Sequence, residues 1–287
     1  MKNVFEELYT TPKAMLNDLL RERRNGNLVF RGISRTLEIK PNIQRVFDRT
    51  KKEFLDLSTF EYSMLDEFYR LGRQHFVSNY DLLDYVATAQ HFGLPTRLID
   101  WTRDPFVALF FAVFMNDSPD NEVYRIFYAD LDDHLVIDRT YTGYTNAELE
   151  SASEFIIKYM NFVTDLKDRG GLKDRIEGRN STIQSLGVQT ITKFKEEGLL
   201  FYDPPLSNPR LSAQQGLFSI VADLEGDTPS IEIERYANSF SVRLSKDNRD
   251  ELLLYLKNMN YTMSRLFPDL SSISSSIILK NIASSKT

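Results

Sequence analysis

The sequence has no cysteine, few glycines and prolines, and no long apolar run, and each shortage excludes a class of protein. Without cysteine there is neither a disulfide framework nor a zinc site built from thiolates. Because glycine and proline number only 12 and 10 in 287 residues, no low-complexity linker divides the chain. The longest apolar run, residues 106–115, is about half of the roughly 20 residues that a membrane-spanning helix needs.

Positive charge is also scarce. The sequence has 35 Lys and Arg against 41 Asp and Glu, a net charge of −6, which argues against a general affinity for the nucleic-acid backbone. The N-terminal segment MKNVFEELYT lacks the apolar centre of a signal peptide. No HxH or HExxH spacing occurs, so we predict no metal site. We expect a soluble, cytoplasmic protein with no membrane partner.

Helical and strand-like patterns alternate along the chain and predict an α+β fold, with mixed short-stranded sheets, packed helices and one buried apolar helix. We divide it into an N-terminal helix (1–26), a central domain (27–244) and a C-terminal helical extension (245–287). The expected helices are residues 5–25, 52–74, 81–91, the segment starting at 105, most of 141–198, and 246–263. The expected strands are residues 28–31, 122–131, 217–224, 230–233 and 239–244.

Residues 90–115, QHFGLPTRLIDWTRDPFVALFFAVFM, form the most informative segment, which we read as a polar loop leading into a buried helix. Asp104 followed by Pro105 is typical of an N-cap and a first helical residue. The unpaired N–H groups at such a helix end attract anions, and Arg97 and Thr102 lie just before it. Alternatively, Arg97 and Asp100 pair with each other and hold the loop closed while Trp101 fills the core.

Other polar residues stand beside glycines. Arg31 ends a short apolar strand before Gly32, a pattern that lets a strand approach a ligand closely. Gln214 and Gln215 precede another strand; they form neutral hydrogen bonds but cannot act as bases, although they also suit a capped loop. His91 ends a helix, where it is either a ligand contact or a core residue.

These residues carry a resemblance. FRG at residues 30–32, QHFGLPTRLIDWTRDPFVALFFAV at residues 90–113 and AQQGLF at residues 213–218 together resemble the FRG-domain family, which occurs in bacteria and phages. The resemblance covers about residues 27–224. It implies that seven residues line one cleft: Arg31, His91, Arg97, Asp100, Thr102, Gln214 and Gln215.

The FRG motif is also similar to the strand that binds NAD phosphates in one class of ADP-ribosyltransferases. On this analogy the cofactor is NAD, and the catalytic side chains are His91, Asp100, Gln214 and Gln215. The residues that would bind NAD are Arg31, Gly32, Arg97, Trp101 and Thr102. Glu232 and Glu234, on an expected strand, have the spacing of that class's final motif. Such an enzyme would modify a nucleic-acid or protein acceptor, as a toxin-like effector in phage defence.

The alternative is a module that binds a nucleotide or a nucleic-acid end without turnover; a nuclease fits less well, because few carboxylates lie near the site. The position of a carboxylate discriminates between transferase and binder, since a transferase places Glu232, Glu234 or another acid near Arg31. Apolar residues in the tail, such as Ile277 and Ile278, suggest a docking helix or homo-oligomerisation through the C-terminal helices.

Overall fold

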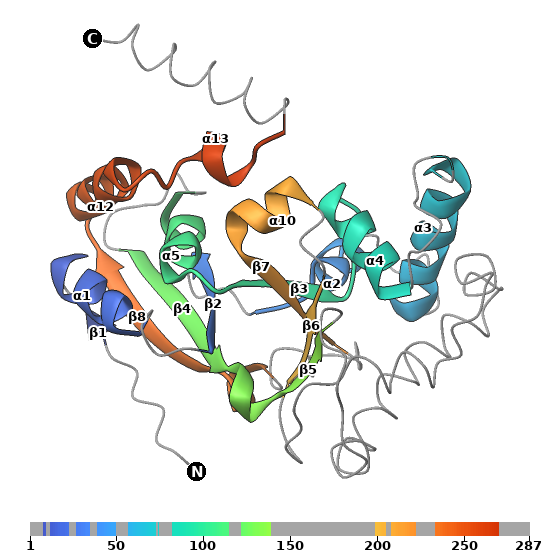
Figure 1. Cartoon of the computed structure of the whole chain (residues 1–287), viewed down its shortest axis with the longest axis horizontal. Coiled ribbons are helices and arrows are strands. Elements are labelled where there is room, and N and C mark those ends of the chain that lie inside the picture. Colours follow the sequence, from blue (N-terminus) through green and yellow to red (C-terminus); the bar gives the residue numbers. More distant parts are fainter. Residues whose placement is uncertain are drawn as a thin grey trace, which may run out of the picture.

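Strands and helices alternate along the chain in the computed structural model (Figure 1). The structure describes residues 8–9, 12–22, 27–34, 39–49, 57–72, 74, 82–114, 122–138, 199–204, 208–221 and 233–269. The predicted helices within residues 141–198 and the predicted contact in the tail lie outside these residues.

One eight-stranded sheet in the order β1-β8-β4-β2-β3-β7-β6-β5 forms the centre, and it confirms the predicted α+β class. The two edge pairs, β1 with β8 and β5 with β6, are parallel, whereas all the inner neighbours are antiparallel. The strands are β1 (Leu8–Tyr9), β2 (Leu28–Ser34), β3 (Leu98–Thr102), β4 (Glu122–Asp130), β5 (Leu135–Asp138), β6 (Leu200–Asp203), β7 (Gly216–Ile220) and β8 (Asn238–Leu244).

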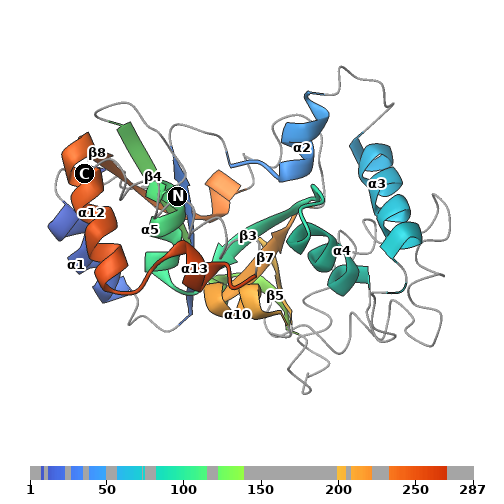
Figure 2. The ribbon, with the colours of Figure 1, turned by 90° about the horizontal axis from the view of Figure 1, so that it is seen from above.

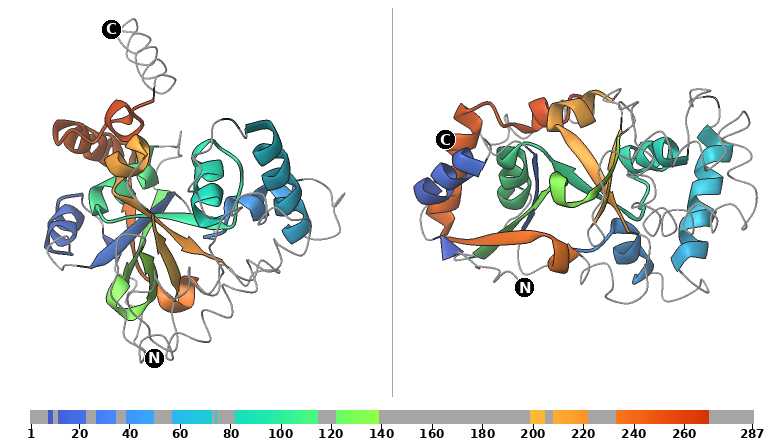
Figure 3. Two further views of the ribbon diagram at one scale, coloured as in Figure 1. Left: turned by 45° about the vertical axis from the view of Figure 1, so that its right-hand side comes forward. Right: turned by 60° about the horizontal axis from the view of Figure 1, so that its bottom comes forward.

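The sheet is nearly divided between β2 and β3. All seven residues of β2 pair with β4, and all five of β3 pair with β7. Between β2 and β3 the register has one pair, Phe30 with Thr102. The strands therefore diverge at Arg31 and Asp100, and Figure 3 shows the two halves of the sheet leaving this junction in different directions. This divergence creates the space for a site.

Helix α5 (Pro105–Phe114) lies against β2 and is the buried apolar helix that the sequence predicts. Its N-cap is Asp104, whose Oδ1 accepts a hydrogen bond of 3.0 Å from the N–H of Phe106. Helices α1 (Pro12–Glu22) and α12 (Lys246–Asn258) cover its outer side through buried residues such as Leu19 and Leu256 (Figure 2). Segments from both ends of the chain thus complete the core around α5, and our division into three parts stays a prediction.

The opposite face of the sheet has its own core. Helices α2 (Asn42–Phe47) and α3 (Leu57–Gly72) cover it, and α4 (Leu82–His91) packs between α3 and β3. Phe60 of α3 shares this core with Ile99 and Trp101 of β3 and with Phe201 of β6. No helix in the described part of the chain combines the length and hydrophobicity that a bilayer crossing requires.

Several local predictions are wrong. Residues 98–102, expected in a loop, form β3, a strand whose residues are all buried except Asp100. The strand through Arg31 continues past Gly32 to Ser34, because the glycine accommodates α5 rather than ending the strand. Residues 233–236 are helical, not extended, and residues 230–232 lie outside the described part. Residues 8–9, expected in the first helix, form β1, because they pair with β8. Strands β5 and β6 were not predicted.

Candidate functional site

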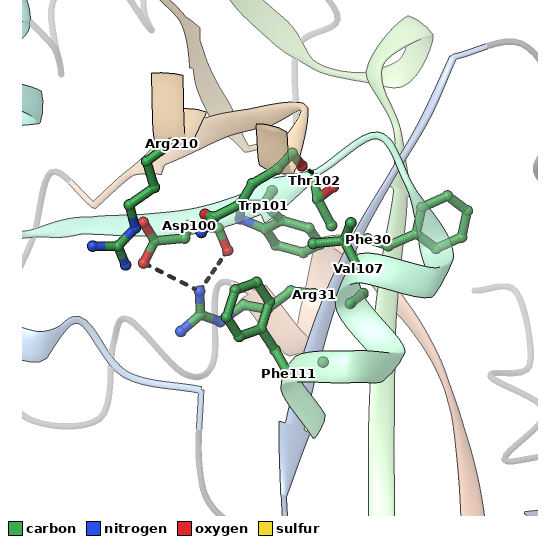
Figure 4. Close-up of a pocket in the computed structure, with 11 residues that line it drawn as sticks. Phe30, Arg31, Asp100, Trp101, Thr102, Val107, Phe111 and Arg210 are labelled. Carbon is green, nitrogen blue, oxygen red and sulfur yellow. Dashed lines mark hydrogen bonds and ion pairs between the residues drawn. The ribbon is translucent and has the colours of Figure 1, made fainter. Parts of the chain in front are cut away.

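A cavity of about 230 Å³ opens where β2 and β3 diverge (Figure 4). Its walls come from β2, β3, α5 and the short helix α10 (Pro209–Gln214). The lining residues are Phe30, Arg31, Gly32, Asp100, Trp101, Thr102, Val107, Ala108, Phe111, Arg210 and Gln214. The cavity therefore combines an apolar floor with two arginines and one carboxylate.

Arg31 extends from β2 towards β3. Its guanidinium Nη1 donates a hydrogen bond to the backbone carbonyl of Asp100 and lies 3.8 Å from that residue's Oδ2. Its Nε is buried and has no hydrogen-bond partner among the described residues. Burial lowers the pKa of Arg31, and the nearby Asp100 carboxylate acts in the opposite direction. Arg31 thus holds a desolvated positive charge with one donor unused.

Arg210 supplies the second positive charge, and it was not among the residues predicted to line the cleft. It lies in the first turn of α10, where the Asn208 side chain accepts a hydrogen bond of 2.8 Å from its backbone N–H. Burial lowers the pKa of Arg210, while Asp100 and Asp269 raise it. In Figure 4 the Asp100 carboxylate lies between the guanidinium groups of Arg31 and Arg210. The pattern Asn-Pro-Arg at residues 208–210 was a signal that a capped helix presents this arginine.

Asp100 is the carboxylate of the cavity. Its side chain is 66% exposed, and its Oδ1 accepts a hydrogen bond of 2.9 Å from Nε2 of Gln90. Gln90 in turn accepts a hydrogen bond from the hydroxyl of Thr96. An exposed acid between two arginines can be displaced by, or can share its partners with, an incoming anion.

Arg97 lies elsewhere, and the prediction that it contacts a ligand in this cleft has to be corrected. Its side chain is only 2% exposed and pairs with Glu61 of α3, which is fully buried. The Nε of Arg97 donates to Oε2 of Glu61 at 2.7 Å, and the backbone N–H of Arg97 donates to Oε1 at 2.8 Å. The buried carboxylate holds this arginine, because an unpaired buried charge is strongly unfavourable. The alternative pairing of Arg97 with Asp100 is also wrong.

Thr102 and Asp104 occupy the N-terminal end of α5. The Thr102 hydroxyl donates to the backbone carbonyl of Gln214 at 2.6 Å and accepts from the N–H of Asp104 at 3.0 Å. Oδ2 of Asp104 accepts a hydrogen bond of 2.7 Å from the Tyr261 hydroxyl. A buried carboxylate already caps this helix end, so the end does not offer a phosphate site of the kind that the sequence suggested.

Trp101 and Gly32 line the cavity but serve packing. Trp101 is 3% exposed, its Nε1 donates to the Ser219 hydroxyl at 2.9 Å, and its indole lies edge-on to Phe201. A Cβ on Gly32 would lie 1.8 Å from the backbone oxygen of Ala108 in α5. Trp101 therefore fills the core, as one of the two alternatives for this residue predicted, and Gly32 permits close packing of helix and strand.

Of the remaining predicted residues, Gln214 lines the cavity, whereas Gln215 and His91 do not. Gln214 lines the cavity, and its Nε2 donates to the carbonyl of Leu266 at 2.9 Å. Gln215 is exposed and ends α10 with a φ of 47°; its carbonyl accepts from the N–H of Arg103 at 3.0 Å. His91, at the end of α4, does not line the cavity. Burial and the positive charge of Arg210 lower the pKa of His91.

Glu234 does not line the cavity either. It belongs to the helical residues 233–236, and its Oε1 accepts a hydrogen bond of 2.9 Å from Nη1 of Arg125. Glu232 lies outside the described residues. Among the residues that the structure describes, Asp100 is thus the acid in the cavity, and no group of three or more His, Asp or Glu is arranged to hold a metal ion.

Comparison with known proteins gives one match. No curated protein and no solved structure is significantly similar to the chain. The family model of the FRG domain matches residues 26–121, roughly a third of the chain. The match includes Arg31, His91 and Asp100, whereas Arg210 and Gln214 lie beyond it. The chain therefore contains an FRG domain at residues 26–121.

Proposed function

We propose that the cleft between β2 and β3 binds a nucleotide and holds its phosphate groups between Arg31 and Arg210. The observation that carries the proposal is the convergence of two guanidinium groups on one cavity. Guanidinium groups present several N–H donors in a plane and suit phosphate oxygens better than any other side chain. Burial removes both guanidinium groups from water and lowers their pKa values. A bound anion would stabilise the charged form of each arginine and so compensate for the lost hydration.

The size and charge of the site favour a small nucleotide over a long nucleic acid. The cavity encloses about 230 Å³ and is built on a protein with a net charge of −6. A duplex or a long single strand is bound through an extended basic surface. The proposed ligands are therefore a mononucleotide, a dinucleotide such as NAD, or the terminal nucleotide of a strand.

Asp100 favours a second candidate function, ADP-ribosyl transfer from NAD. In such a reaction the bond between ribose and nicotinamide breaks, and nicotinamide leaves with the bonding electrons. The acceptor forms a new bond to the ribose carbon, and its proton passes to a base. A carboxylate beside the phosphate site could stabilise the developing positive charge on the ribose and accept that proton. In this proposal Asp100 takes the place that the sequence analysis gave to Glu232 or Glu234, and a toxin-like role in phage defence depends on this activity.

Calorimetric titration with ADP and with NAD tests nucleotide binding. Hydrogen bonds between charged partners contribute about 1.5–3 kcal/mol each. We therefore expect Arg31→Ala and Arg210→Ala each to weaken binding at least about tenfold. Arg21→Ala removes an exposed arginine of α1 and should leave the affinity unchanged. Equal affinities in all four proteins would refute the proposal.

Release of nicotinamide separates the transferase from the binder. A transferase should release nicotinamide from NAD in the presence of its acceptor, and Asp100→Asn should abolish release while NAD still binds. If NAD binds and depends on Arg31, yet protein and nucleic-acid acceptor pools yield no nicotinamide, the site is a binding module.

A further inference from the structure

We propose that Phe267, directly after the short helix α13 (Met263–Leu266), is a positioning residue that holds the guanidinium group of Arg210 at the cavity. This inference rests on the proposed phosphate site and adds to it a segment near the end of the described chain. Residues far outside the FRG match at 26–121 then help to determine how tightly a phosphate is held.

Arg210 has less support inside the cavity than Arg31 has. Arg31 donates a hydrogen bond to the carbonyl of Asp100, whereas Arg210 makes no hydrogen bond or ion pair with the other lining residues (Figure 4). A long side chain that becomes fixed only when a ligand binds lowers the affinity, because it loses rotamer freedom. A guanidinium group that the protein already holds in place binds an anion without this loss.

The ring of Phe267 can hold Arg210 in this way. The guanidinium carbon of Arg210 lies over the ring, 4.4 Å from its centre, which is within the range of a cation–π interaction. A carboxylate partner would occupy N–H donors of the arginine. An aromatic ring covers one face of the guanidinium plane and leaves the N–H donors at its edge available. Phe267 therefore fixes the arginine without competing with a phosphate.

Phe267 is itself attached to the wall of the cavity. Its ring lies nearly perpendicular to that of Phe111, which lines the cavity, with centroids 5.7 Å apart. The preceding residue, Leu266, is fully buried, and its carbonyl accepts a hydrogen bond of 2.9 Å from Nε2 of the lining residue Gln214. Helices α10 and α13 accordingly lie side by side (Figure 2). Phe267 thus joins Arg210 to a side chain of α5.

A double-mutant cycle on the affinity for ADP tests this inference. Phe267→Leu keeps an apolar side chain but removes the ring, and it should weaken ADP binding about two- to tenfold, the effect of immobilising one long side chain on binding. In an Arg210→Ala background the same substitution should have no further effect, whereas in an Arg31→Ala background it should keep its effect. Phe267→Tyr should retain the affinity of the unmodified protein.

Phe240→Leu is the matched control. Phe240 is partly buried against the same core as Phe267 and contacts another aromatic ring, that of Tyr128, with centroids 6.2 Å apart, but it does not line the cavity. This variant should bind ADP as the unmodified protein does. Phe267→Met, whose flexible side chain fills similar space, provides a second variant without a ring.

A second measurement needs no ligand. The ring current of Phe267 should shift the NMR signal of the Arg210 Nε–H group in the unmodified protein, because the guanidinium lies over the ring. Phe267→Leu should move this signal to the range of an arginine without a neighbouring ring. A signal that does not respond to the substitution would refute the positioning role.

The outcomes separate this inference from the phosphate site itself. If ADP binding depends on Arg210 but is unchanged in Phe267→Leu, the positioning role is refuted and the phosphate site stands. The same holds if Phe267→Leu weakens binding equally with and without Arg210. If the unmodified protein does not bind ADP, or binds it equally well without Arg210, both proposals fail together.

Discussion

Removing either member of the buried pair Glu61–Arg97 should destabilise the protein far more than removing an exposed pair. Glu61→Leu leaves the Arg97 guanidinium, 2% exposed, without its carboxylate, and also leaves the backbone N–H of residue 97 without its acceptor. Breaking a buried ion pair costs about 3–5 kcal/mol, and an unsatisfied buried amide costs about 1–3 kcal/mol more. Arg97→Met should also be strongly destabilising, because it leaves the fully buried Glu61 carboxylate without its positively charged partner.

The assay is urea unfolding followed by far-ultraviolet circular dichroism, for each single variant and for the double variant Glu61→Leu/Arg97→Met. The double variant should lose less stability than the sum of the single losses, since no buried charge remains. Arg21→Met breaks an ion pair with Asp18 in which the arginine side chain is 69% exposed. This substitution should change the free energy of unfolding by less than about 1 kcal/mol. A loss below 1 kcal/mol in Glu61→Leu, or strictly additive losses, would refute this assignment of Arg97.

Two further predictions concern packing and pH. Gly32→Ala should lower the free energy of unfolding by more than about 3 kcal/mol, because the new Cβ would lie 1.8 Å from the backbone oxygen of Ala108. Gly93→Ala has open space around a φ of +93° and should lower it by only about 1–2 kcal/mol. Equal urea midpoints for these two variants would contradict this prediction. Burial lowers the pKa of His134 from 6.5 to about 4, so between these values the unfolded chain binds the proton and the folded protein does not. The free energy of unfolding should therefore fall by up to about 3 kcal/mol as the pH falls from about 6.5 to about 4. A His134→Asn variant should lose less stability over that range. If the unmodified protein and the variant lose stability in parallel as the pH falls, this linkage is ruled out.

The sequence predicted those elements whose signals are local. The buried helix α5 was recognisable because its apolar residues directly follow Asp104 and Pro105. Strand β3 was missed because it is short and buried on both faces, which removes the alternation that identifies a strand. The helical residues 233–236 were misread because Glu-Ile-Glu alternates as a strand does, although a short helix carries Glu234 to Arg125.

The site was predicted in part. Arg31 and Asp100 do line one cavity, as expected from the motifs that contain them. The partner of Arg97 lies 36 residues away in α3, and no pattern near Arg97 indicates a buried glutamate there. Arg210 joins the cavity only because β7 pairs with β3, which brings Gln214 next to Thr102 across 112 residues of sequence. Contacts over such separations depend on the register of the whole sheet, which the sequence pattern does not specify.

We propose that Arg31 and Arg210 form one phosphate site. Its most direct test is the affinity of ADP for the unmodified protein, for Arg31→Ala and Arg210→Ala, and for the control Arg21→Ala, measured by calorimetry at one salt concentration. We expect saturable binding that each site variant weakens at least about tenfold and that the control leaves intact. Binding that is insensitive to both site arginines, or no binding at all, would contradict it.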